Sequence, residues 1–99
     1  MSETVTRHRG AHRDGDGKWH EGGDAPLKCL EIAPGGGSRY NDRLREGETI
    51  ACTVFFALGT DLVNEDELTV RGERYQIIVN EWRSRSRGGL EVLCTRGEG

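Results

Sequence analysis

The chain has 99 residues and a formal net charge of −3, with 14 basic and 17 acidic side chains. This length predicts a single domain, and the acidic balance argues against a free-standing nucleic-acid binder. No apolar run reaches membrane length and no signal peptide is present. We therefore expect a soluble protein that is not exported and has no membrane partner.

The apolar residues are unevenly distributed. Leu, Ile, Val and Phe total 20, and 15 of them lie between Ile50 and Leu93, whereas residues 1–26 contain only Val5. The second half can form a core, but the first quarter cannot do so unaided. We predict a flexible N-terminal segment over residues 1–26 that packs on neighbouring subunits, and a small β-barrel domain over residues 27–99.

The N-terminal half predicts short strands between polar loops. Residues 3–9 alternate weakly and predict a short edge strand, and residues 10–26 predict a loop or wide hairpin around Trp19. Residues 27–33 predict a strand that Pro34 and the following glycines close. Residues 38–48 then predict a polar loop.

The strongest predicted strand covers residues 49–58. One face carries Ile50, Cys52, Val54, Phe56 and Leu58. The other carries Ala51, Thr53, Phe55 and Ala57, which are apolar enough to predict burial on both sides.

Residues 66–79 predict a β-hairpin. A type II′ turn at Gly72–Glu73 would pair Val70 with Tyr75 and Leu68 with Ile77, and would bring Val79 opposite Asp66. The apolar residues of both strands then share one face, while Thr69, Arg71, Arg74 and Gln76 share the other.

The C-terminal part predicts a second polar loop over residues 83–89 and a last strand over residues 90–96, with Val92 and Cys94 inward. No segment keeps a helical period. The predicted fold class is all-β, a small antiparallel β-barrel or sandwich of five to six short strands with two long polar loops.

No pattern of catalytic or metal-binding residues emerges. His8, His12, His20 and Cys29 match no compact zinc spacing. Asp61, Glu65, Asp66 and Glu67 lack the ligand order of an EF-hand loop, and we interpret them as solvated turn charges. Ser84 and Ser86 have no base beside them, and Gly35–Gly37 is not a phosphate loop. We predict no enzyme activity, no cofactor and no metal.

The cysteines and arginines allow two further interpretations. Cys52 and Cys94 lie within apolar alternations, so we interpret them as reduced, buried small hydrophobes rather than disulfide partners. Both predicted loops are locally basic. In a lone monomer their arginines would be solvated, but in a ring they would repeat in every subunit and attract phosphates or an acidic partner. These residues are Arg39, Arg43, Arg45, Arg83, Arg85 and Arg87.

Several segments together resemble a known family. They are residues 19–21 (WHE), 29–34 (CLEIAP), 53–61 (TVFFALGTD), 66–75 (DELTVRGERY), 81–82 (EW) and 89–97 (GLEVLCTRG). From about Arg7 to the C-terminus, the chain resembles the head-to-tail stopper, or head-closure, proteins of long-tailed actinobacteriophages. Ala57 departs from the pattern, because these proteins often carry Pro there.

The resemblance implies a structural virion protein without catalysis. Such proteins form a homo-oligomeric ring, dodecameric or hexameric, in the neck of the virion after assembly in the host cytoplasm. The ring lies below the portal and adaptor and above the tail terminator and tail tube. It closes the DNA-filled capsid and docks the tail.

The resemblance also implies roles for particular residues. The loop over residues 34–48 would project into the channel and hold back packaged double-stranded DNA. Its channel-facing residues would be Gly35, Gly36, Gly37, Ser38, Arg39, Tyr40, Asn41, Asp42, Arg43 and Arg45. Contacts between subunits or with partners would involve Arg83, Arg85, Arg87, Trp82 and Trp19.

Two other classes of function stay open. A small barrel that binds single-stranded nucleic acid would need aromatic platforms and a basic groove. The chain has only six aromatic residues by the count of Phe, Trp and Tyr, and Phe56 and Tyr75 are expected in the core. An accessory interaction module, such as an antitoxin or adaptor, is the third possibility.

Overall fold

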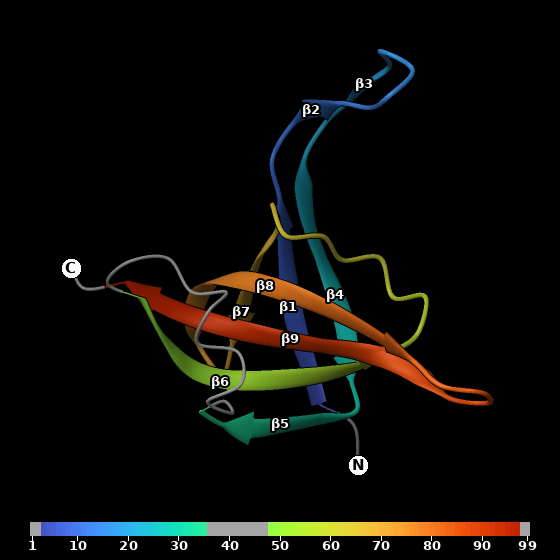
Figure 1. Cartoon of the computed structure of the whole chain (residues 1–99). Helices are drawn as coiled ribbons and strands as arrows, with labels where there is room; N and C mark the ends of the chain where they lie inside the picture. The colour runs from blue at the N-terminus through green and yellow to red at the C-terminus, as the bar shows by residue number, and fades with distance from the viewer. Residues whose placement is uncertain (1–2, 36–47, 98–99) are drawn as a thin grey trace.

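The structure is a computed structural model that describes residues 3–35 and 48–97. Within these ranges it contains nine β-strands (Figure 1). No helix in the described part is long and apolar enough to cross a membrane. The all-β prediction is confirmed. The strands are β1 Glu3–Arg9, β2 His12–Arg13, β3 Trp19–His20, β4 Gly23–Cys29, β5 Glu31–Pro34, β6 Glu48–Ala57, β7 Glu67–Val70, β8 Glu73–Arg83 and β9 Gly88–Gly97.

Seven of these strands form one antiparallel sheet in the order β4-β1-β7-β8-β9-β6-β5. In Figure 1, β1 and β4 run across β8, β9 and β6, so the sheet folds back over itself. It is not a closed barrel, because β4 and β5 form its two edges. A smaller sheet pairs β2 with β3.

The two edges of the large sheet are consecutive in the chain and are joined at Leu30. The Leu30 amide donates a hydrogen bond to the carbonyl of Phe55 at 2.7 Å, which fixes this corner. The prediction of one strand over residues 27–33 is therefore wrong. The segment divides into the end of β4 and the start of β5, and each half pairs with a different neighbour.

The core lies on the concave face of the folded sheet. Phe56, Leu68, Ile77 and Val92 are at most 1% exposed. The predicted facing of the strongest strand is confirmed for Val54 and Phe56, which are buried. The other core side chains are Val5, Cys29, Leu62, Val70, Leu90 and Cys94.

The hairpin over residues 66–79 forms, but its register differs from the prediction. Val70 pairs with Glu73 and Leu68 with Tyr75. The turn residues are Arg71 and Gly72, with φ of 50° and 86°. Positive φ at both positions defines a type I′ turn, which has the twist that a two-residue hairpin needs.

This register moves the pairing by two residues along the partner strand. Because side chains alternate with a period of two, a shift of two keeps every side chain on its predicted face. Leu68, Val70 and Ile77 accordingly share the buried face. Asp66 does not lie opposite Val79, whose amide donates instead to the side chain of Asn64 at 2.6 Å.

The predicted polar loop over residues 83–89 is shorter in the structure, because Arg83, Gly88 and Gly89 belong to strands. The β8–β9 ladder continues to the pair Arg83–Gly88, so only residues 84–87 form the turn. The Ser84 amide donates to the carbonyl of Arg87 at 2.8 Å and closes it. Val92 and Cys94 point into the core as predicted.

Strand β1 is an interior strand rather than the predicted edge strand. It pairs along its whole length with β4 and through residues 6–8 with β7. Val5 is 2% exposed and belongs to the core. In this structure residues 3–9 and 23–29 are part of the main sheet, so the predicted domain boundary at residue 26 falls inside β4.

Hydrogen exchange of the free monomer should distinguish an interior strand β1 from the predicted flexible N-terminal segment. We expect slow amide exchange in β1, because the strand pairs along its length with β4, residues 6–8 also pair with β7, and Val5 is buried. Residues 10–22 should exchange faster. Rapid exchange throughout residues 3–9 would contradict the interior position and support a flexible N-terminal segment.

Two arginines of β1 hold the loop between β6 and β7. The Arg9 side chain donates to both oxygens of Asp66, at 2.8 and 2.7 Å, and also contacts Asp61. Arg7 Nη1 donates to Asp61 Oδ2 at 3.1 Å. The interpretation of these acids as solvated is wrong for Asp66, whose side chain is 1% exposed.

The ionisation of Asp66 follows from these partners. Burial raises the pKa of this carboxyl, but the hydrogen bond from Arg9 and the backbone amide of Val63 outweigh burial. The net pKa of Asp66 lies below its ordinary value. Asp66 is therefore ionised at neutral pH and fixes both the loop and β1.

Candidate functional site

Two hairpin ends project from the main sheet (Figure 1). The first, which we call the Trp19 arm, comprises residues 10–22 between β1 and β4 and carries β2 and β3. The second, the arginine arm, comprises residues 82–89 and joins β8 to β9. Each arm presents a tryptophan, since Trp19 is 55% and Trp82 is 43% exposed. Exposed tryptophans at such positions are candidates for contact with a partner.

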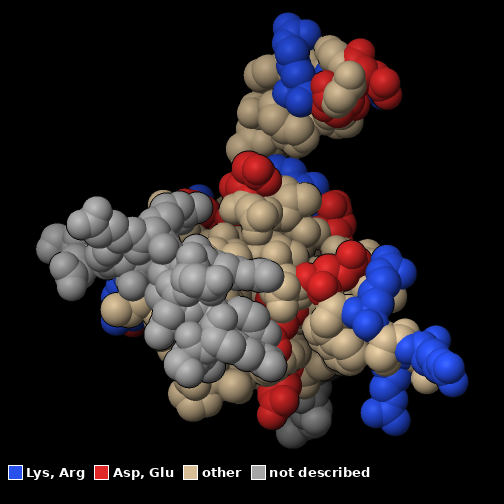
Figure 2. Space-filling view, in the orientation of Figure 1, with Lys and Arg blue, Asp and Glu red and all other residues tan. Residues whose placement is uncertain are grey.

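The arginine arm concentrates positive charge at its end. Figure 2 shows a group of basic side chains there, next to acidic side chains nearer the body of the molecule. Arg83 contacts Glu81 at 3.3 Å. Arg85 and Arg87 are exposed and make no ion pair with any residue that the structure describes. As far as the described residues go, these charges are available to an external anion.

Two glycines allow bulky side chains to lie against the arginine arm. A Cβ atom at Gly89 would lie 3.1 Å from the carbonyl oxygen of Phe56 and 3.3 Å from Trp82 Nε1. A Cβ atom at Gly88 would lie 3.0 Å from Cδ2 of Leu58. The absence of side chains at these positions therefore sets where Trp82 and Leu58 sit.

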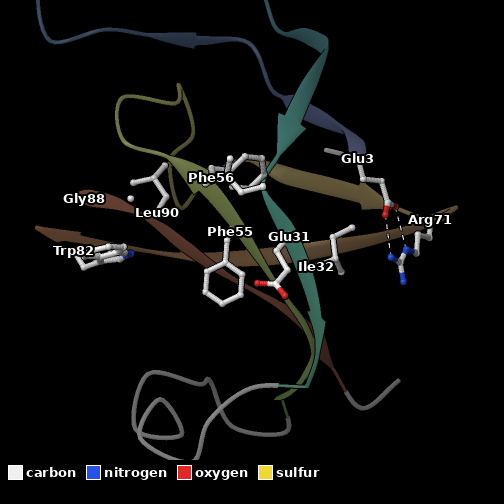
Figure 3. Close-up of a pocket in the computed structure, with 11 residues that line it drawn as sticks. Glu3, Glu31, Ile32, Phe55, Phe56, Arg71, Trp82, Gly88 and Leu90 are labelled. Atoms are coloured by element: carbon white, nitrogen blue, oxygen red, sulfur yellow. Dashed lines mark hydrogen bonds and ion pairs between the residues drawn. The ribbon is translucent and has the colours of Figure 1, made fainter. Parts of the chain in front are cut away.

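Trp82 forms one end of a pocket of about 580 Å³ (Figure 3). The pocket runs between the arginine arm, the corner at Leu30 and the end of β7. Its lining residues are Glu3, Leu30, Glu31, Ile32, Phe55, Phe56, Arg71, Trp82, Gly88, Gly89 and Leu90.

The two ends of this pocket differ in polarity. Trp82 provides an apolar end, and Leu30, which is 63% exposed, adds apolar surface to the lining. At the other end Arg71 binds Glu3 through two hydrogen bonds, at 3.0 and 2.9 Å (Figure 3). The hydrogen bond from Arg71 lowers the pKa of Glu3, so this end holds an ion pair at neutral pH. An apolar side chain followed by a charged one would match this arrangement.

The Trp19 arm is stabilised by contacts within itself. The guanidinium of Arg13 lies 5.7 Å from the Trp19 ring, and the rings of His12 and His20 stack at 5.2 Å. His20 Nε2 lies 2.7 Å from Asp14 Oδ2, and this hydrogen bond lowers the pKa of Asp14. The arm thus holds a defined shape away from the core.

A chain of hydrogen bonds crosses the outer side of three strands. His8 Nδ1 lies 2.7 Å from Asp24 Oδ1, and His8 Nε2 lies 2.6 Å from Thr69 Oγ1. These residues come from β1, β4 and β7, so the contacts connect the three strands. Within residues 3–35 and 48–97, no group of three or more His, Cys, Asp or Glu side chains is placed to hold a metal ion.

The structure places the predicted contact residues on two separate arms. Trp82, Arg83, Arg85 and Arg87 lie together on the arginine arm, whereas Trp19 lies on the other arm. Most of the predicted channel residues lie outside the described residues; these are Gly36, Gly37, Ser38, Arg39, Tyr40, Asn41, Asp42, Arg43 and Arg45.

Gly35 is the described residue of that channel set, and it is anchored to β6. Its amide donates to the carbonyl of Ala51 at 3.1 Å, and its carbonyl accepts from Thr53 Oγ1 at 2.8 Å. Its φ of 66° lies in the left-handed region that favours glycine.

Sequence reasoning missed the pocket beside Trp82. The sequence pattern places Leu30 in the middle of one predicted strand and Phe55 on a face of another. Nothing in the local pattern marks Leu30 as a corner, because both alternating rows of residues 27–33 mix polar and apolar side chains. The pocket depends on β5, β6 and the arginine arm meeting in space.

Comparisons of the chain with models of protein families, with curated proteins and with solved structures found no match.

Proposed function

We propose that this chain is a structural protein of a phage virion, a head-to-tail stopper that forms a ring under the portal and adaptor. The ring closes the DNA-filled capsid and docks the tail. The sequence segments described above carry the resemblance, and the all-β antiparallel fold is compatible with it. The single observation that best supports the proposal is the arginine arm, with its exposed Trp82 and its arginines that lack ion partners among the described residues.

The arginine arm is suited to a contact between subunits. The chain is acidic overall, at −3, but the arm is basic, so its end and the acidic body have opposite charge. A head-to-tail contact between identical subunits closes into a ring when the rotation between them is a simple fraction of a turn. In such a ring the arm of one subunit would meet the body of the next, and Trp82 would supply the apolar part of the contact.

The ring would place the protein in the neck of the virion after assembly in the host cytoplasm. Its partners would be its own copies, the portal and adaptor above, the tail terminator and tail tube below, and the packaged double-stranded DNA. We propose that the loop over residues 34–48 faces the channel. Gly35 would tie the start of that loop to β6.

The proposal is tested by deleting the gene for this chain from the phage that encodes it. We expect DNA-filled heads that lose DNA and carry no tails, as seen by electron microscopy and by nuclease sensitivity of the packaged DNA. Supplying the intact chain in trans should restore infectivity. Normal virions formed without the chain, or virions in which mass spectrometry does not find it, would overturn the proposal.

Charge reversal tests the role of the arginine arm in the same assay. Arg85→Glu and Arg87→Glu should each fold but restore infectivity poorly, because each places a negative charge at the proposed contact. Lys28→Glu is the matched control, since Lys28 is exposed on β4 and makes no ion pair with described residues. Equal rescue by all three variants would contradict the arm contact. Tight, salt-sensitive binding of single-stranded DNA by the isolated protein would instead favour a nucleic-acid-binding module.

A further inference from the structure

Cys52 and Cys94 lie directly opposite each other on β6 and β9. Both face the core, where Cys94 is buried and Cys52 packs half-buried against it. Directly opposed residues of an antiparallel pair have Cα atoms about 4.5–5.5 Å apart. That spacing lies within the roughly 4.4–6.8 Å range that a disulfide bridges. The backbone therefore holds the two residues at a separation that a disulfide can span.

Local structure gives this pair some freedom to adjust. The β6–β9 register shifts between Ile50 and Cys52, which marks a bulge next to the cysteine pair. A bulge changes the local twist and aims side chains differently from a regular ladder. The two thiols are close enough that Cys94 affects the pKa of Cys52.

The two thiols have different environments, and these suit them to different steps. One cysteine would attack a small disulfide, and the other would then displace the second small thiol from the mixed disulfide. The hydrogen bond from Cys94, helped by the positive charges of Arg71 and Arg96, lowers the pKa of Cys52 to about 7. The same hydrogen bond and burial raise the pKa of Cys94, which keeps its proton. Cys52 is thus the more exposed cysteine of the pair and the one that forms a thiolate more readily. Thiolates are the reactive form in thiol–disulfide exchange.

We propose that Cys52 and Cys94 form a reactive dithiol site that low-molecular-weight disulfides convert to an intramolecular disulfide. The Cys52 thiolate attacks one sulfur of the small disulfide, breaks its S–S bond and releases one small thiol. Cys94 then loses its proton, attacks Cys52 Sγ of the mixed disulfide and displaces the second small thiol. The two protein thiols are oxidised, the small disulfide is reduced to two thiols, and these carry the two protons.

Cys29 provides a control within the same chain. Its side chain is 0% exposed, and its thiol donates to the carbonyl of Glu3 at 3.3 Å. Burial raises the pKa of Cys29, and its cross-strand neighbour is Glu3 rather than another cysteine. Cys29 has neither access to the small disulfide nor a resolving partner, so it should remain a thiol.

The new bond would connect β6 and β9, which are both central to the core. It would close the chain between residues 52 and 94 and so restrict the unfolded ensemble. The thermal midpoint of the oxidised protein should therefore exceed that of the reduced protein. This inference rests on the two strands alone and does not depend on the proposed virion role.

The test uses the reduced 99-residue chain and oxidised glutathione at neutral pH under native conditions. Intact mass should fall by two hydrogen atoms, and the thiols that react after unfolding should fall from three to one. Peptide mapping should locate the bond between Cys52 and Cys94. A lasting glutathione adduct on Cys52, a bond that includes Cys29, or no reaction would each overturn the proposal.

Three variants separate the steps. Cys29→Ser should oxidise like the intact chain. Cys94→Ala should stop at the mixed disulfide and gain the mass of one glutathionyl group on Cys52. Cys52→Ser should react with oxidised glutathione at least about tenfold more slowly, since its remaining thiols, Cys29 and Cys94, are buried. Equal oxidation rates for Cys52→Ser and the intact chain would contradict the assigned roles.

Discussion

Replacing Phe56 by alanine should lower the free energy of unfolding by about 3–5 kcal/mol. Phe56 is 1% exposed and is among the largest fully buried side chains in the described part of the molecule. Its removal leaves a cavity that the strands β6 and β9 cannot fill without moving. Domains of this size have a total stability of about 5–15 kcal/mol, so the variant should be close to unfolding at room temperature. Urea denaturation followed by circular dichroism measures the change.

The neighbouring residue provides the matched control. Phe55 is the same residue type on the same strand, but it points to the other side and is half-buried beside the pocket. Phe55→Ala should cost about 1 kcal/mol. If Phe55→Ala were the more damaging change, the facing of β6 would be inverted.

Replacing Asp66 by asparagine should cost about 3 kcal/mol, because it leaves the positive charge of Arg9 without its main partner. The side chain of Asp66 is 1% exposed and that of Arg9 is 20% exposed. Water can reach part of the guanidinium, which places the cost at the low end for a broken buried pair. Asparagine keeps the size of the side chain and can still accept from the Val63 amide. Denaturation midpoints measure the loss, and Glu65→Gln, an exposed change nearby, should stay within about 0.5 kcal/mol.

The same pair should affect the pH dependence of stability. The pKa values of Asp66 and Asp61 are lowered in the folded protein from 3.8, the ordinary value for Asp. A carboxyl with a lowered folded pKa stabilises the protein above its unfolded pKa and loses that contribution as pH falls through the folded pKa. The intact chain should therefore lose stability below about pH 4, and Asp66→Asn should lose less over that window. If Asp66→Asn had the same denaturation midpoint as the intact chain and lost stability equally on acidification, the role of the Asp66–Arg9 pair would be contradicted.

The local alternation of side chains predicted the faces of the strands correctly at their centres. It was wrong for Leu58, which lies beyond the end of β6 and is exposed. Phe56 and Val54 on β6, Leu68 and Val70 on β7, and Val92 and Cys94 on β9 all point to the core, as the sequence pattern predicts. Alternation is a property of a single extended chain, so it does not depend on which strand lies beside it. For the same reason the all-β class follows from the short apolar runs and the glycine-rich turns between them.

The predicted register of the β7–β8 hairpin was wrong for a related reason. Two registers that differ by two residues put the same side chains in the core, so hydrophobic pattern cannot choose between them. The choice depends on the turn, where Arg71 and Gly72 both take positive φ. An arginine in that conformation is uncommon, so the sequence pattern favours a turn one residue later, at Gly72–Glu73.

Of the candidate site, the sequence predicted the grouping of Trp82 with Arg83, Arg85 and Arg87, because these residues are adjacent in the chain. Three further features depend on contacts between residues far apart in the sequence. They are the interior position of β1, the pairing of Arg9 with Asp66, and the pocket that joins Leu30 and Phe55 to Trp82. The local sequence pattern predicts the direction in which each side chain points. Its neighbours depend on the folded sheet, because the energy of strand pairing involves two segments that are far apart in the sequence.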